Sequence, residues 1–287
     1  MDDVRLPPDT RIGAVHLTVS DLARSVAFYR EHVGLAARAD APPGTARLHA
    51  GGSDLLVLRE SRDAVRPHRA TGLYHFALRV PSRAALGAVL AHFAASRTPL
   101  TGASDHGVSE ALYLPDPDEI GIEIYADRPR EQWPIVEGTI RMLSEELDWD
   151  GLHAAAPDAP WTGIAPGTDM GHVHLHVAAL DPVERFYVDT LGFERTLRLG
   201  GSALFVAAGG YHHHVGLNTW HGLGAPPPPP GAIGLDHYVI ELPDDAAVER
   251  VLARARAADT PESASPEGPL LADPAANRLR LARAARG

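Results

Sequence analysis

The chain has 287 residues, of which 45% are hydrophobic and 22% charged, so it can form one large or two ordinary globular domains with a full core. Its formal net charge of -11 argues against nucleic acid or an anionic membrane surface as a partner, because both require a basic patch. The chain has neither cysteine nor lysine, which excludes disulfides, thiolate chemistry and Schiff-base catalysis, whereas 16 histidines remain.

The beginning of the chain shows no targeting pattern. The first residues, MDDVRLPPDT, lack the charged and then apolar order of a signal peptide. No apolar run approaches the roughly 20 residues that are needed to cross a bilayer. These features predict a cytoplasmic protein.

The first predicted module opens with a strand over residues 14–19 and continues with a helix. Ser20 and Asp21 suit the N-cap of that helix, Gly34 suits the position after its end, and apolar residues recur between them at helical spacing. Strand-like runs follow at 46–50 and 54–60.

The second predicted module has the same order of elements. A strand over 73–80 precedes a helix over 82–92, and strands follow at 110–114 and 121–125. Each module therefore has the order strand, helix and then further strands.

The second half of the chain repeats the first half at a nearly constant offset. The stretch IGAVHLTVSDLARSVAFYREHVGL at 12–35 matches MGHVHLHVAALDPVERFYVDTLGF at 170–193, an offset of 158. GLYHFALRV matches GLDHYVIEL at an offset of 162, and the two strands that follow an Asp-Pro pair match at 157. Three blocks at similar offsets indicate a duplicated two-module unit.

The repeat predicts an α+β fold of four βαβββ modules. A metal-bearing pair of modules is expected at 10–128, a helical connector at 129–168, and a second pair without the same metal triad at 169–285. The proline run at 224–231 predicts a stiff loop between the third and fourth modules.

Strand alternation turns three metal-binding side chains away from the apolar faces of their strands. His16 in AVHLTV, His75 in LYHFALRV and Glu123 in GIEIYAD each stand on the face opposite the apolar residues. If these strands curl together, two imidazoles and one carboxylate face a common cavity. That donor set is the facial triad of non-haem Fe(II) enzymes, which leaves positions open for substrate and dioxygen.

The four-module pattern, the histidines of the opening strands and the DPD…GIEIY ending resemble the vicinal oxygen chelate superfamily of glyoxalase, bleomycin resistance and extradiol dioxygenase proteins. The resemblance covers nearly the whole chain and is closest to the catechol 2,3-dioxygenases. It implies two half-barrel domains and a metal, Fe(II) or else Mn(II), held by His16, His75 and Glu123. It also implies an extradiol ring-cleaving dioxygenase that acts on a small aromatic diol and O2.

The same resemblance implies acid–base and hydrogen-bonding groups beside the metal. Tyr113 stands ten residues before Glu123, where the family has a tyrosine, and His106 stands where it has a histidine. The family has a further acid–base histidine before the second metal ligand. His68 is the one histidine near that place, although its spacing differs.

The second half departs from the first in its candidate ligands. Arg280 falls opposite Glu123 in the repeat, so the second half cannot complete the same triad. Two histidine clusters indicate either a polar lining or a metal site that combines His174, His214 and His237. The clusters consist of His172, His174 and His176, and of His212, His213 and His214.

Alternatives concern both the pairing of modules and the reaction. If module two closes with module three, His174 replaces His16 as the first ligand. A glyoxalase-like lyase or isomerase needs a second carboxylate on strand 54–60, where only Glu60 at its end is available, and a metal-free binding or resistance protein has no use for the triad. The choice among catechols and hydroquinones stays open, as does the oligomeric state, although exposed half-barrel edges are compatible with self-association.

Overall fold

The structure, a computed structural model, describes residues 4–285 and contains the four predicted βαβββ modules. Module one comprises β1 (Arg11–Val19), α1 (Leu22–Phe28), the π-helical turn η1 (Tyr29–Val33), β2 (Ala36–Ala37), β3 (Thr45–His49) and β4 (Asp54–Glu60). Module two comprises β5 (Gly72–Arg79), α2 (Arg83–Ser96), β6 (Gly102–Asp105), β7 (Ser109–Pro115) and β8 (Gly121–Asp127). Module three comprises β11 (Asp169–His176), α4 (Leu180–Glu184), η3 (Arg185–Leu191), β12 (Glu194–Leu199), β13 (Ala203–Ala207) and β14 (Val215–Asn218). Module four comprises β15 (Gly234–Leu242), α5 (Asp245–Ala257), β16 (Glu262–Ser263), β17 (Leu270–Ala272) and β18 (Arg278–Arg283).

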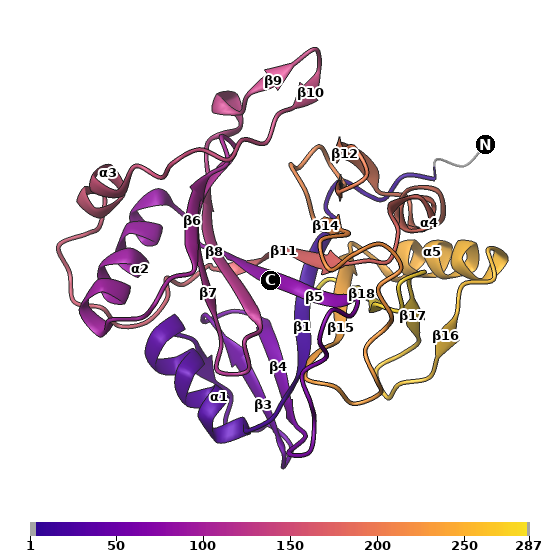
Figure 1. Ribbon diagram of the computed structural model, residues 1–287, viewed down its shortest axis with the longest axis horizontal. Coiled ribbons are helices and arrows are strands. Elements are labelled where there is room, and N and C mark those ends of the chain that lie inside the picture. The colour runs from indigo at the N-terminus through magenta and orange to yellow at the C-terminus, as the bar shows by residue number, and fades with distance from the viewer. Residues whose placement is uncertain (1–3, 286–287) are drawn as a thin grey trace.

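The modules form two curled sheets of eight strands each, which are the two half-barrels (Figure 1). One sheet has the order β16-β17-β18-β15-β1-β4-β3-β2, and the other has the order β12-β13-β14-β11-β5-β8-β7-β6. The opening strands of paired modules are antiparallel neighbours. His16 faces His237 between β1 and β15, and His174 faces His75 between β11 and β5.

This order pairs module one with module four and module two with module three, which corrects the expectation that the first two modules close together. The ranges 10–128 and 169–285 follow the repeat along the chain, but each half-barrel takes one module from each range. All four modules share one apolar pattern, so periodicity alone does not determine which opening strands become neighbours.

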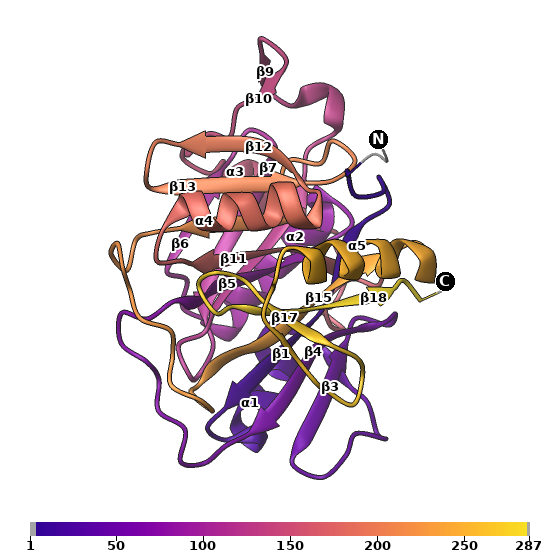
Figure 2. The ribbon, with the colours of Figure 1, turned by 90° about the vertical axis from the view of Figure 1, so that its right-hand side faces the viewer.

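The helices cover the outer faces of the sheets. In Figure 1, α1 and α2 lie on one side of the molecule and α4 and α5 on the other, and Figure 2 shows α4 and α5 in front of the strands that they cover. The side chains of Asp21 and Ser82 cap α1 and α2 by accepting backbone N–H bonds, and the Asp21 cap is the one that the sequence predicts. Gly34, with φ 84°, ends the first helical segment in the left-handed conformation.

The segment 129–168 links modules two and three. It contains the short 3-10 turn η2 (Arg130–Gln132), a ribbon of β9 (Ile135–Val136) and β10 (Thr139–Ile140), and α3 (Trp149–Ala154). Helix α3 packs closely on α2, where a Cβ added at Gly87 would lie 2.5 Å from the carbonyl oxygen of Leu152. Within residues 4–285, no helix combines the length and apolar character needed to cross a membrane.

The repeated Asp-Pro pair fixes the turn before the last strand of modules two and four. Asp116 Oδ1 accepts hydrogen bonds of 2.8 Å from the backbone N–H groups of Asp118 and Ile120, and its Oδ2 accepts one of 3.0 Å from the Tyr29 hydroxyl. Its twin Asp273 accepts the equivalent set, including a bond from a tyrosine hydroxyl. The shared motif is therefore a structural turn rather than a reactive site.

Replacing Asp116 with alanine is expected to lower the free energy of unfolding by about 3 kcal/mol, because buried donors lose a charged acceptor. Tyr29→Phe removes only one of these bonds and is expected to cost about 1 kcal/mol. Urea unfolding followed by circular dichroism measures both values. A loss below about 1 kcal/mol for Asp116→Ala would show that the turn forms without the carboxylate.

Candidate metal centre

A row of residues across four strands forms the floor of the candidate site. His172 on β11 faces Ala77 on β5, Ala77 faces Glu123 on β8, and Glu123 faces Tyr113 on β7. His75 lies two residues before Ala77, so its side chain leaves the same face of β5. Because Ala77 has only a methyl group, the longer side chains around it have room to converge.

Three donor atoms meet at this floor. His75 Nε2 lies 3.1 Å from Glu123 Oε2 and 3.3 Å from His172 Nε2, and His172 Nε2 lies 3.2 Å from the same carboxylate oxygen. All three residues are buried. Across residues 4–285, they are the one group of three or more potential ligand residues whose donor atoms all lie within 4.8 Å of one another.

Two glycines permit the close strand packing that positions the imidazoles. A Cβ added at Gly121 on β8 would lie 2.2 Å from the carbonyl oxygen of Tyr74 and 3.1 Å from the Cβ of His75. A Cβ added at Gly216 on β14 would lie 2.9 Å from the ring of His174. A side chain at Gly121 would therefore displace the strand that carries His75, and one at Gly216 would displace the ring of His174.

The charge states of the donors suit a cation. Burial raises the pKa of Glu123, but the neighbouring His172 and His75 outweigh burial and hold this pKa well below its usual range. Burial lowers the pKa of His172 to about 4, against the opposing effect of Glu123. At neutral pH the site thus offers a carboxylate and a neutral imidazole, both of which are metal ligands.

The donor set fits a divalent ion. Two ligand atoms that each lie about 2.1 Å from one ion, at neighbouring positions, are about 3 Å apart, which is close to the three separations in the structure. Without a cation, the two imidazole nitrogens and the carboxylate oxygen would make three close contacts in a buried site. Two neutral imidazoles carry at most two protons for these contacts, so at least one pair of atoms would meet without a hydrogen bond. His75, His172 and Glu123 would hold the ion, and this nitrogen and oxygen set suits both Fe(II) and Mn(II).

Tyr113 and His106 form a hydrogen-bonded pair beside Glu123. The Tyr113 hydroxyl lies 2.8 Å from His106 Nε2, and His106 Nδ1 lies 2.8 Å from the carbonyl oxygen of Leu143. The carbonyl can only accept, so Nδ1 carries the ring proton and Nε2 accepts the phenol proton. Burial, followed by the charge of Glu123, raises the pKa of Tyr113 well above its usual value, which keeps the hydroxyl protonated.

A chain of histidines leads from His172 toward Asp127. The His213 ring is centred 4.1 Å from the His172 ring, and His213 Nδ1 lies 2.8 Å from His212 Nδ1. His212 Nε2 lies 2.8 Å from Asp127 Oδ1. Three groups connected in this way can pass a proton between the site and Asp127.

His214, the last member of this cluster, is a structural residue with a neutral ring. Its Nδ1 accepts a hydrogen bond of 3.2 Å from the Ala208 backbone N–H, and burial lowers its pKa to about 3. An unfolded histidine titrates near pH 6.5, so this contribution to stability is complete above that pH and is lost as the pH falls toward 3.

Through His214, the free energy of unfolding is expected to fall by up to about 2 kcal/mol between pH 7 and pH 5, because only the unfolded chain binds the extra proton. Urea denaturation of wild type and His214→Gln at both pH values measures this difference. His153→Gln changes an exposed histidine and should keep the wild-type pH dependence. The assignment is wrong if His214→Gln keeps it too.

The structure brings four of the six predicted site residues together: His75, His106, Tyr113 and Glu123. It excludes His16, which lies on β1 in the other sheet and stacks on His237 with ring centroids 3.9 Å apart. The prediction that His16 completes the triad is therefore wrong, because module one pairs with module four.

His68 and the second-half alternatives also differ from expectation. His68 is exposed in the segment between β4 and β5, outside the cluster of donors. The combination of His174, His214 and His237 does not form, since His237 belongs to the other sheet. Module two does pair with module three, which one of the alternatives predicted. The third donor beside His75 and Glu123 is nevertheless the Nε2 of His172 and not a nitrogen of His174.

The sequence indicates His172 and His213 only as members of histidine clusters and does not place either of them beside Glu123. The repeat aligns His16 with His174. A β-bulge between Met170 and His172 changes the register of β11, so His172 is the histidine that lies in the row with Ala77 and Glu123. The run HVHLH was the available signal, because it places three histidines on one strand face of the module.

Paired βαβββ modules with two histidines and a glutamate on one concave sheet define a class of half-barrel proteins with a candidate metal centre. Residues 11–124 match the family described as Glyoxalase/Bleomycin resistance protein/Dioxygenase superfamily. A catechol-2,3-dioxygenase of Bacillus subtilis (strain 168) is 44% identical over 252 residues, which span 86% of this chain and 88% of the relative. The chain therefore belongs to this superfamily, and within it to the dioxygenase enzymes.

Solved structures share the fold over nearly the whole chain. A Bacillus subtilis protein provisionally described as a dioxygenase has a TM-score of 0.63 and 15% identity, and the match covers 96% of this chain and 87% of that one. Glyoxalase I from Zea mays has a TM-score of 0.59 and 16% identity, with 96% and 92% covered. At these identities the likeness concerns the fold alone.

Proposed function

We propose that the protein is an extradiol ring-cleaving dioxygenase, which uses Fe(II) and O2 to open a catechol-type diol beside its hydroxyl groups. The observation that carries this proposal is the convergence of His75, His172 and Glu123 within 3.3 Å of one another in a buried site. The 44% identity to a catechol-2,3-dioxygenase supports the same reaction class. Mn(II) is the alternative ion for this ligand set.

The metal, when bound, supplies Lewis-acid chemistry and electron transfer between a diol and dioxygen. The residues of the chain then handle the protons. The Tyr113 hydroxyl, which donates to His106 in the structure, is placed to donate to a diol or dioxygen oxygen instead. His213 is placed to accept a diol proton and to pass it through His212 to Asp127.

The site chemistry favours this reaction over its rivals. A glyoxalase-like lyase or isomerase needs a second carboxylate on the last strand of the module that pairs with module two. That strand is β14, and its sequence VGLN contains no carboxylate. The cluster contains one carboxylate, from Glu123. A metal-free binding protein would gain nothing from three converging polar donors in a buried site, because desolvating them is costly.

Iron-reconstituted protein with catechol under air tests the proposal. The expected result is a yellow ring-fission product, formed in equal amount to the O2 consumed and carrying both atoms of labelled dioxygen. Turnover of a diol without O2 uptake, or a product that contains oxygen from water instead, would replace the dioxygenase with another activity.

Tyr113→Phe is expected to lower kcat about 100-fold while the iron content stays at the wild-type level, because the hydroxyl moves protons but does not hold the metal. Steady-state oxygen uptake and metal analysis measure the two quantities. Tyr238→Phe removes a buried hydroxyl from the other half-barrel and serves as the control. Equal rates for the two variants would remove Tyr113 from the reaction.

A further inference from the structure

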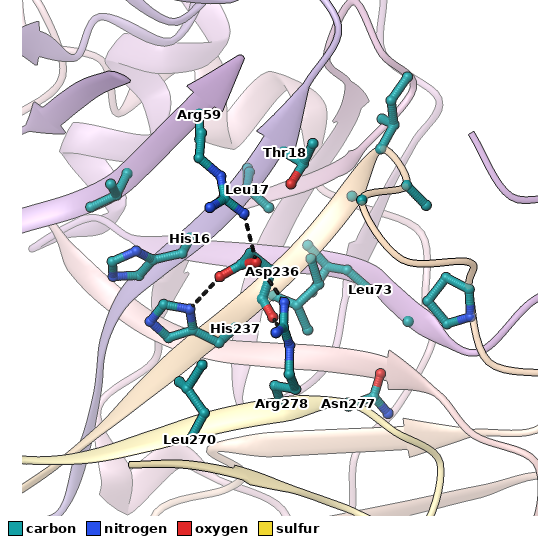
Figure 3. A pocket seen from close by; sticks show the side chains of 18 of the residues that line it. His16, Leu17, Thr18, Arg59, Leu73, Asp236, His237, Leu270, Asn277 and Arg278 are labelled. Atoms are coloured by element: carbon teal, nitrogen blue, oxygen red, sulfur yellow. Dashed lines mark hydrogen bonds and ion pairs between the residues drawn. The ribbon is translucent and has the colours of Figure 1, made fainter. Parts of the chain in front are cut away.

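A cavity of about 1300 Å³ lies mainly in the half-barrel of modules one and four and extends to β5 and β11 of the other half-barrel. It is lined by His16, Arg59, His237, Arg278 and Arg280, with further residues from the loop before β15. Figure 3 shows His237 beside His16, and Asp236 between Arg59 and Arg278. We call this space the second cavity. The proposed metal ligands do not line it.

The second cavity is electropositive in a chain that is strongly acidic. Five arginines and three carboxylates line it, and Arg66 is paired with Glu119 just outside the lining, which leaves a net charge of about +1 when the histidines are neutral. Burial, followed by the neighbouring His237 and Arg280, lowers the pKa of His16 to about 3, so His16 adds no positive charge of its own. The whole chain, in contrast, has a net charge of -11. A local excess of arginine favours an anionic ligand.

Two buried polar atoms of the second cavity have no hydrogen-bond partner among the described residues. They are the Nε of Arg280 and the Nε2 of His237. Arg280 uses its terminal nitrogens on Glu267, at 2.9 Å from the carboxylate, which leaves Nε as a free donor. His237 is 7% exposed, and a buried polar atom without a partner is costly unless a ligand or water satisfies it.

The contact between His237 and Asp236 determines what each free atom can bind. His237 Nδ1 lies 2.7 Å from Asp236 Oδ2, and a carboxylate can only accept, so Nδ1 carries the proton. Arg59 and Arg278 hold Asp236 at 3.0 and 2.5 Å and keep it in place. With the ring proton on Nδ1, His237 keeps Nε2 as an acceptor that suits a hydroxyl, and Arg280 keeps Nε as a donor that suits a carboxylate. Both atoms lie just beneath the cavity surface, so a ligand reaches them when the two side chains rotate.

The rest of the lining is apolar and calls for a ligand with a hydrocarbon body. Leu17, Leu73 and Leu270 line the second cavity, together with the proline run at 227–230. Prolines lose little conformational entropy when a ligand packs on them. Arg280 is also the repeat twin of Glu123, so the position that carries a ligand carboxylate in one half-barrel carries a guanidinium in the other.

We propose that the second cavity binds a small organic acid with a hydroxyl group on an apolar body. Arg280 donates to the carboxylate of this acid, and His237 Nε2 accepts from its hydroxyl. This site needs no metal and is independent of the proposed ring cleavage.

Isothermal titration of the iron-loaded protein with 3-hydroxybenzoate and with 3-hydroxybenzamide tests the proposal. The two probes have nearly the same shape and differ in charge. We expect the acid to bind at least tenfold more tightly than the amide, and Glu123→Gln to leave this preference unchanged. Equal affinity for the two probes would overturn the proposal, and so would loss of binding in Glu123→Gln, which would place the acid at the metal centre.

Variants on β18 localise the binding. Arg280→Leu is expected to abolish the preference for the acid, whereas Arg283→Leu removes the same charge from the same strand outside the second cavity and should keep it. His237→Phe should equalise the affinities of 3-hydroxybenzoate and benzoate, which the wild type distinguishes. An unchanged preference in Arg280→Leu contradicts the assignment. The comparison of acid and amide on the wild type decides the matter if a variant does not fold.

Discussion

His172→Ala is expected to lose at least nine-tenths of the bound iron and all measurable diol-dependent oxygen uptake, whereas His16→Ala keeps both. The reason is the order of the strands. Module three, not module one, lies beside module two, so His172 Nε2 reaches Glu123 at 3.2 Å and His16 stacks on His237 in the other half-barrel. Metal analysis after anaerobic reconstitution and desalting measures the iron, and an oxygen electrode measures the activity.

His174→Ala distinguishes two neighbours on the same strand face. His174 faces His75 directly across the strands, yet its Nε2 has no partner among the described residues and lies outside the cluster of three donors. This variant is expected to keep most of its iron. Circular dichroism confirms that each variant is folded. Iron that is lost from His16→Ala or His174→Ala but kept in His172→Ala would contradict the assignment.

His213→Gln is expected to lower kcat about 1,000-fold and to leave the iron content unchanged. Glutamine can keep a hydrogen bond to His212, but it cannot accept the diol proton that His213 is proposed to transfer. The loss should therefore appear in single-turnover experiments as well as in the steady state, with little change in KM for the diol.

His214→Gln is the matched control for this prediction, because it changes the next residue of the same cluster, which bonds to the Ala208 backbone instead of His212. Its kcat is expected to stay within about threefold of wild type. A similar small change in His213→Gln would show that protons leave the site by another route, and the His106–Tyr113 pair would then be the first to examine.

Much of the fold follows from local signals in the sequence. Asp21 and Gly34 begin and end the first helical segment where their capping chemistry predicts. The repeat reveals four modules, and alternation along β5 and β8 places His75 and Glu123 on the concave side of their sheet. Their proximity follows because the two strands belong to one module and are neighbours in the sheet.

The pairing of modules could not be predicted in the same way. It depends on which opening strands meet edge to edge, and β1, β5, β11 and β15 all carry the same alternating pattern. The choice of His172 depends further on one bulge in β11 and on the methyl group of Ala77 across the strand. These are properties of contacts between distant segments, whereas the repeat compares segments that are equivalent but not in contact.

The most direct measurement is an anomalous difference map at the iron edge from crystals of the reconstituted protein. We expect a single strong peak enclosed by the imidazole nitrogens of His75 and His172 and the carboxylate of Glu123. A peak beside His16 and His237, or none near Glu123 in protein that turns over catechol, would contradict it.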